Sequence, residues 1–231
     1  MYKHFFKRLI DIMLSLLLLI GLSLILIFIV FAIKIDSKGP VIFKQERIGK
    51  DGKVFKIYKF RSMYVGAENK GSGVYSGKND TRVTKVGRIL RATSLDELPQ
   101  TINILKGDMS FIGPRPPLTY HPWLYDEYTE TQRRMFEMRP GVTGWAQIHG
   151  RKEVEWHKRI ELNIWYIDHV SLWLDLKIFF MTIGKVFTNV NNENIGETVK
   201  TETQIEKEVA MTESLPDETE NMDEKNSKYL H

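Results

Sequence analysis

The sequence predicts a mostly helical α+β protein, in which an N-terminal membrane-inserted helix precedes a compact basic domain that contains a β-hairpin. Three observations lead to this class. Residues 12–33 form a run of 22 positions without a charged side chain. Extended segments flank Asp51-Gly52, and helical periodicity dominates residues 84–107 and 151–188. The predicted organisation is a membrane helix over 1–36, a globular domain over 37–190 and a tail over 191–231.

Charge is distributed unevenly along the chain. Residues 191–231 hold 11 acidic and 4 basic side chains, a net charge of −7, so residues 1–190 have a net charge of +11 although the whole chain has +4. The acidic composition of the tail predicts disorder. A basic body beside a membrane helix suits anionic lipid and phosphate-bearing substrates. Nucleic acid is not an expected partner, because the sequence shows no helix-turn-helix and no stacking platform.

The apolar run is long enough to cross a bilayer. A helix of this length reaches about 33 Å, against about 30 Å for the hydrocarbon core. It is too long for a signal peptide, and Ala32-Ile33-Lys34 is not a small-residue cleavage site. Lysine and arginine flank the run on both sides, so the positive-inside rule selects no orientation. The residues slightly favour one straight span; the alternative is a helix broken near Gly21 and Ser23 that returns to the same side.

The rest of the chain alternates extended and helical segments. Residues 40–63 predict a hairpin that turns at Asp51-Gly52, and its second arm carries Lys59, which is most simply a solvent-facing strand position. Residues 64–80 predict a glycine-rich loop, and residues 110–115 a short strand that ends in a turn. Residues 151–188 predict two helices, the second capped by Ser171. The five tryptophans suit either a membrane interface on amphipathic helices or the core.

Asp96 and Glu97 are the densest candidate for chemistry. Arg88 and Arg91 precede these adjacent carboxylates. The structural alternative is a capping box, in which Ser94 caps a helix and Glu97 reaches back to it. Pro99 weakens that alternative, because it would then fall at the fifth helical position and remove a hydrogen bond. On pattern alone the two interpretations are about equally supported.

Two further positions are candidates. Prolines fix the backbone on both sides of Arg115, which suits binding of a phosphate, or simply a rigid turn with a solvent-facing arginine. Asp175 stands in an apolar run and needs a partner, either Lys177 or an arginine elsewhere. The chain has no cysteine, no histidine pair with zinc-ligand spacing and no glycine-rich nucleotide loop after a predicted strand. These absences exclude disulfide scaffolds, thiolate catalysis and Cys-ligated metal sites.

Five motifs in order resemble the bacterial sugar transferases, specifically the small, single-domain type of monotopic polyprenyl-phosphate phosphoglycosyl transferase. The resemblance runs from Lys7-Arg8-Leu-Ile-Asp11 to about Phe187, and only the tail lies outside it. The motifs are FKIYKFR at 55–61, SLDELPQ at 94–100, LKGDMSFIGPRP at 105–116, RPGVTGWAQ at 139–147 and LDLK at 174–177.

The resemblance implies a reaction. A UDP-sugar gives its sugar-1-phosphate to undecaprenyl phosphate, UMP leaves, and surface glycan assembly begins. In the family an aspartate attacks the sugar-linked phosphate to form a phosphosugar-aspartyl intermediate. Asp96 matches that nucleophile and Glu97 its partner, and the two are implied to hold Mg²⁺. The positions that match substrate-binding residues are Lys59, Arg91, Arg115 and Asp175.

The resemblance also implies a location. It implies a re-entrant membrane helix with both ends cytoplasmic, and a catalytic domain on the cytoplasmic face of the bacterial inner membrane. Two departures are Leu24, where relatives have proline after a serine, and Asn163, where relatives often have aspartate. The sugar stays open among galactose, glucose, N-acetylhexosamines and bacillosamine-type sugars, and later glycosyltransferases of the same pathway are possible partners. The alternatives are a membrane-tethered scaffold or regulator without turnover and a membrane-anchored phosphohydrolase.

Overall fold

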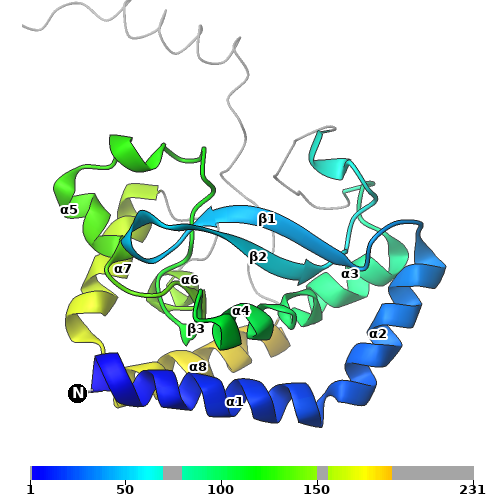
Figure 1. Cartoon of the computed structure of the whole chain (residues 1–231), viewed down its shortest axis with the longest axis horizontal. Coiled ribbons are helices and arrows are strands. Elements are labelled where there is room, and N and C mark those ends of the chain that lie inside the picture. The colour runs from blue at the N-terminus through cyan, green and yellow to red at the C-terminus, as the bar shows by residue number, and fades with distance from the viewer. Residues whose placement is uncertain (1, 70–79, 150–155, 189–231) are drawn as a thin grey trace, which may run out of the picture. The chain divides into compact units, whose positions relative to one another are not determined.

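The structure is a computed structural model that describes residues 2–69, 80–149 and 156–188. Its described part is mostly helical with two small sheets, which confirms the predicted α+β class (Figure 1). The predicted tail lies outside the described residues, as do residues 70–79 of the predicted loop and 151–155 of the predicted helical region. The main elements are η1 (Tyr2–Phe6), α1 (Lys7–Gly21), α2 (Ser23–Asp36), β1 (Ile42–Ile48), β2 (Val54–Phe60), α3 (Lys85–Ala92), η4 (Leu95–Glu97), α4 (Gln100–Lys106), β3 (Ser110–Ile112), α5 (Glu130–Arg133), β4 (Gly141–Thr143), α6 (Trp145–Ile148), α7 (Trp156–His169) and α8 (Leu172–Thr188).

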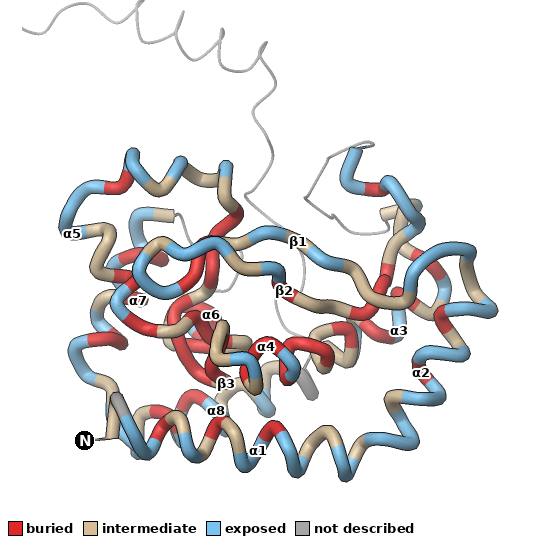
Figure 2. The backbone as a smooth tube through the Cα atoms, viewed as in Figure 1, coloured by how far each residue is buried: buried red, intermediate tan, exposed pale blue. Residues whose placement is uncertain are grey.

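The N-terminal apolar run forms two helices rather than one. α1 ends at Gly21, α2 begins at Ser23, and the two helices are bent by 65°. The prediction of one straight span is therefore wrong, and the break falls between the two residues at which the sequence allows a bend. In the described part of the chain no single helix is long and apolar enough to cross a membrane, whereas the bent pair meets that test as a unit. Most of α2 is exposed, as Figure 2 shows.

The hairpin forms where Asp-Gly predicts it. β1 pairs antiparallel with β2 from Ile42 opposite Phe60 to Ile48 opposite Val54. Asp51 and Gly52 at the turn have φ angles of 56° and 76°, the left-handed conformation that a tight hairpin turn requires. The predicted hairpin is confirmed.

The side chain of Asn103 in α4 hydrogen-bonds to the backbone of strand β2, at the edge that does not pair with β1. Its Oδ1 accepts a hydrogen bond from the backbone N–H of Tyr58 at 2.9 Å, and its Nδ2 donates to the carbonyl of Lys56 at 2.8 Å. Asn103 is fully buried, so these bonds satisfy strand groups that would otherwise be buried without partners. α4 therefore lies against β2, with an apolar cluster of Ile57, Ile104 and Met109 beneath.

Three glycines hold the turn that follows β3. β3 pairs parallel with β4, and Gly113 donates its N–H to the carbonyl of Thr143 at 2.9 Å. A methyl group on Gly144 would lie 2.1 Å from the Gly113 carbonyl oxygen, and one on Gly141 would lie 2.1 Å from the Gly113 nitrogen. Only residues without a side chain permit this approach. The motif at 139–147 thus forms one unit with the Gly113–Arg115 turn.

The predicted pair of C-terminal helices is confirmed in the described residues. α7 ends at His169, and α8 begins at Leu172 with the backbone N–H of Leu174 donating to Ser171 Oγ at 3.3 Å. Both helices pack into a core cluster that also takes residues from β3 and α6. The buried members of this cluster are Ile112, Met138, Ile148, Tyr166, Ile167 and Ile178.

The close approach at Gly144 generates a stability prediction. Gly144→Ala forces a methyl group against backbone that cannot yield like a flexible side chain, so we expect a loss of about 1–3 kcal/mol and a lower melting temperature. Gly184→Ala in α8 is the matched control, because no atom of the described residues lies within 4 Å of its added methyl group and alanine favours a helix by about 1 kcal/mol. Equal melting temperatures for the two variants would contradict the described packing of the turn.

Candidate active site

Asp96 and Glu97 lie on η4, the short turn between α3 and α4. Ser94 before them has a φ of 57° and its side chain caps no backbone group. The capping-box alternative is therefore wrong, because an N-cap residue needs an extended backbone rather than a left-handed one. Pro99 precedes the first residue of α4 instead of falling inside a helix. Neither carboxylate of the pair is needed to cap a helix.

Glu97 of η4 forms an ion pair with Lys59 of strand β2. Lys59 Nζ lies 2.6 Å from Glu97 Oε1, and the two side chains are 22% and 27% exposed. The interpretation of Lys59 as a solvent-facing strand residue is therefore wrong. The contact between α4 and the edge of β2 brings these residues together, although 38 positions separate them in sequence.

Asp96 is a buried carboxylate with little compensation. It is 9% exposed, and in the described part of the chain its carboxylate accepts no hydrogen bond from any other residue. Burial raises its pKa to about 6; Lys59 and Arg91 oppose this rise, and Glu97 adds to it. Two cations therefore act on Asp96, but they do not fully offset the loss of water around it.

Arg91 faces the pair from α3. Burial lowers the pKa of its guanidinium, while the charges of Asp96 and Asp80 act in the opposite direction. Arg88, one turn earlier on the same helix, is exposed. Asp96, Glu97, Lys59 and Arg91 thus form one cluster, as the sequence resemblance implies, with two carboxylates balanced by two cations.

Arg115 lies on a separate turn. The carbonyls of Pro116 and Pro117 accept hydrogen bonds from Arg47 Nη1 and the Ile48 backbone N–H, both at 3.1 Å, so β1 fixes the segment after it. Among the described residues the Arg115 side chain makes no hydrogen bond or ion pair, either with the Asp96–Glu97 pair or elsewhere. Its guanidinium is half-buried and can accept an anion.

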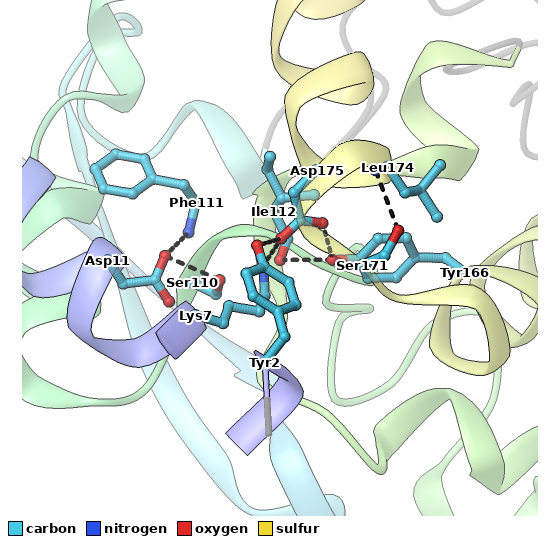
Figure 3. Close-up of polar contacts among 10 residues, drawn as sticks. All are labelled: Tyr2, Lys7, Asp11, Ser110, Phe111, Ile112, Tyr166, Ser171, Leu174 and Asp175. Carbon is cyan, nitrogen blue, oxygen red and sulfur yellow. Dashed lines mark hydrogen bonds and ion pairs between the residues drawn. The ribbon is translucent and has the colours of Figure 1, made fainter. Parts of the chain in front are cut away.

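Asp175 is not brought to the pair. Its carboxylate accepts hydrogen bonds at 2.6 Å from Tyr2 Oη, Lys7 Nζ and Tyr166 Oη, and it is 5% exposed (Figure 3). The predicted need for a partner is correct, but the partner is Lys7 rather than Lys177 or an arginine. Its substrate-binding role stays a prediction, and the structure shows its oxygens fully engaged within the protein.

Sequence reasoning missed a buried polar stripe on α1, of which Lys7 belongs to this network. Lys7, Asp11 and Ser15 are spaced four apart on one face of a helix whose other positions are mostly apolar, and all three are buried. The four-residue spacing of polar side chains on an apolar helix could have predicted this stripe. Buried ionised side chains require partners, which must then come from elsewhere in the fold.

The described residues hold no cluster of three or more metal-ligating side chains. The Asp96–Glu97 pair nevertheless fits Mg²⁺, which commonly binds one or two protein carboxylates and takes its other ligands from water and substrate phosphates. The buried, incompletely compensated charge of Asp96 suits binding of a cation.

The comparisons with known proteins identify sugar transferases as relatives of this chain. A sequence model described as bacterial sugar transferase matches residues 2–189. EpsL of Bacillus subtilis, described as an uncharacterized sugar transferase, is 45% identical over 183 residues, which are 79% of this chain and 88% of that protein. The UDP-glucose:undecaprenyl-phosphate glucose-1-phosphate transferase of Klebsiella pneumoniae is 51% identical over 189 residues, which are 80% of this chain and 40% of that protein.

A third relative is named for another sugar. The UDP-N-acetylgalactosamine-undecaprenyl-phosphate N-acetylgalactosaminephosphotransferase of Aeromonas hydrophila is 40% identical over 187 residues, 80% of this chain and 44% of that protein. The chain thus spans less than half the length of the two relatives named for an activity. The match over residues 2–189 includes the membrane-type helices, the hairpin and the carboxylate pair, and the chain belongs to the bacterial sugar transferase family.

Proposed function

We propose that this protein transfers sugar-1-phosphate from a UDP-sugar to undecaprenyl phosphate and releases UMP. The observation that supports this most strongly is the buried Asp96, whose raised pKa and two neighbouring cations suit attack on an anionic phosphate. The relatives from Klebsiella pneumoniae and Aeromonas hydrophila are named for UDP-linked sugars and an undecaprenyl-phosphate acceptor. Because these two relatives are named for different sugars, the sugar of this protein stays open.

The proposed reaction has two displacements at one phosphorus atom. An oxygen of Asp96 attacks the phosphorus bonded to the sugar, and the bond from that phosphorus to the bridging oxygen breaks, so UMP leaves. An oxygen of undecaprenyl phosphate then attacks the same phosphorus and releases the Asp96 carboxylate. Lys59 and Arg91 stabilise the negative charge that develops near Asp96, and Arg115 binds donor phosphate.

We propose Mg²⁺ as the cofactor, held by Asp96 and Glu97. When bound, it neutralises phosphate charge and lowers the repulsion between two anionic reactants. The ion pair between Lys59 and Glu97 fixes the Glu97 carboxylate at the edge of the hairpin, and Lys59 restrains where that carboxylate can reach. An added cation stabilises the ionised Asp96 more than the ionised Glu97, because Glu97 already has an ion pair with Lys59.

We propose that α1 and α2 enter the cytoplasmic face of the inner membrane as a re-entrant pair. Support comes from the 65° bend and from the large apolar side chains that both helices expose. α8 adds an amphipathic face suited to the interface, on which Trp173 is 81% exposed and Phe180 is 65% exposed. This arrangement places the site where a cytoplasmic donor and a membrane-bound acceptor meet.

A donor panel tests the proposed activity. With undecaprenyl phosphate, Mg²⁺ and UDP-sugars, the wild type is expected to form lipid-linked sugar phosphate and UMP, and Asp96→Asn to lose about 10³-fold or more because an amide is not a nucleophile towards phosphorus. Asp126→Asn, at an exposed carboxylate, is the control. Release of free sugar phosphate without lipid product would indicate a phosphohydrolase, and no turnover with any donor a non-catalytic scaffold.

The raised pKa of Asp96 predicts a trade between stability and activity. Because the folded state holds the Asp96 proton more tightly than the unfolded state, stability falls as pH rises from about 4 to about 6 and stays lower above that range. Asp96→Asn cannot ionise, so at pH 7 it is expected to be more stable than wild type by about 1–3 kcal/mol, an advantage absent at pH 4. Glu97→Gln, which removes the partner of Lys59, is the contrasting variant and gains no stability. Thermal melts that show Asp96→Asn below wild type at pH 7 would contradict this account of the site.

The re-entrant arrangement predicts a labelling pattern. The chain has no cysteine, so Lys3→Cys and Lys38→Cys each introduce one thiol, on either side of the helix pair. Neither thiol is expected to react with a membrane-impermeant maleimide in intact cells, and both should react after permeabilisation. Labelling of Lys3→Cys alone in intact cells would show a pair that crosses the membrane.

A further inference from the structure

The polar stripe of α1 is buried against the globular part of the chain. Lys7 is 6% exposed, Asp11 4% and Ser15 0%, while Leu9, Met13 and Leu17 on other faces are strongly exposed. Burying ionised side chains is costly unless each one is paired or hydrogen-bonded. The partners of Lys7 and Asp11 therefore indicate which parts of the fold this stripe holds.

Asp11 binds the first two residues of β3. Its Oδ1 accepts hydrogen bonds from Ser110 Oγ and from the backbone N–H of Phe111, both at 3.1 Å (Figure 3). β3 runs for three residues and leads into the Gly113–Arg115 turn. The Asp11 carboxylate of α1 thus fixes the start of the strand that precedes Arg115.

Lys7 reaches the other end of β3 through an intermediate. Its ammonium binds Asp175 Oδ2, and Asp175 Oδ1 accepts the hydroxyl of Tyr166, both at 2.6 Å. The same hydroxyl lies 3.5 Å from the carbonyl oxygen of Ile112, the last residue of β3. Figure 3 shows these contacts beside those of Asp11 with Ser110 and Phe111.

Arg8 connects the same helix to α4, the helix that follows the carboxylate pair. Its Nη1 and Nη2 donate to the carbonyls of Ile104 at 2.5 Å and Leu105 at 3.1 Å, at the end of α4. α4 begins just after the Asp96–Glu97 turn. α1 therefore holds both the segment that follows the carboxylates and the strand that precedes Arg115, two parts of the site that also meet in the apolar cluster of Ile104, Met109 and Phe111.

We propose that Asp11 is a positioning residue for the transfer reaction. Through β3 it holds Arg115 in register with Asp96, so that one donor diphosphate meets both. This inference rests on the proposed function. It assigns α1 a role inside the active site in addition to any role in the membrane.

Two substitutions at Asp11 separate positioning from charge. Asp11→Asn keeps an Oδ1 that can accept both hydrogen bonds, so donor KM is expected within about threefold of wild type. Asp11→Leu keeps the approximate volume but removes the acceptor, and the resulting misplacement of Arg115 is expected to raise donor KM about ten- to a hundredfold. KM for undecaprenyl phosphate is expected to change little. Ser15→Ala is the matched control, because Ser15 is buried one turn along the same face and its hydroxyl has no partner among the described residues.

Ser110→Ala provides a milder variant that still folds if Asp11→Leu does not. Removing one of two donors is expected to raise donor KM about threefold in the wild type and to have no further effect in Asp11→Leu, because the contact is already lost. Equal donor KM for Asp11→Asn and Asp11→Leu, or a fall in melting temperature without a change in donor KM, would overturn the positioning role. A wild type that releases no UMP with any donor would instead overturn the proposed function.

Discussion

Burying a carboxylate is costly unless donors or cations replace the water it loses, and this fold meets that constraint unequally at its buried aspartates. Asp175 accepts hydrogen bonds from three side chains, one of them Lys7. Asp11 accepts two from the start of β3. Asp96 accepts none from another residue in the described part of the chain, and burial raises its pKa to about 6. Burial also raises the pKa of Asp11, despite the charge of Lys7 and its two hydrogen bonds. We assign the chemistry to Asp96 because, of the three, it alone accepts no hydrogen bond from another described residue.

The buried polar contacts of α1 explain why a membrane-type helix and a compact domain form one working unit. The apolar faces of α1 are exposed, while its polar stripe contacts β3, α4 and α8. A helix that only anchored the protein would need no buried ion pair. Residues 1–190 have a net charge of +11, which suits anionic lipid and phosphate-bearing substrates.

Local patterns predicted the local structure. Asp51-Gly52 sets its own hairpin turn, and Ser171 caps the helix that follows it, because both depend on neighbouring residues alone. Contacts between distant segments were not predictable in this way: 168 positions separate Lys7 from Asp175. The left-handed backbone of Ser94 was not predictable either. The sequence Ser94-Leu-Asp-Glu97 matches a capping box, and only the folded conformation at η4 excludes that box. The family resemblance assigned Lys59 to the site, but its ion pair with Glu97 was not predicted.

The central claim is that Asp96 is held in an incompletely compensated state so that it can bond to phosphorus. Mass spectrometry of the protein after incubation with a UDP-sugar and Mg²⁺, without lipid acceptor, tests this most directly. The account predicts about one UMP released per active site and a sugar-phosphate mass added to the peptide that contains Asp96, both removed by adding undecaprenyl phosphate. An adduct on another residue, or full transfer activity with no adduct at any time, would contradict it.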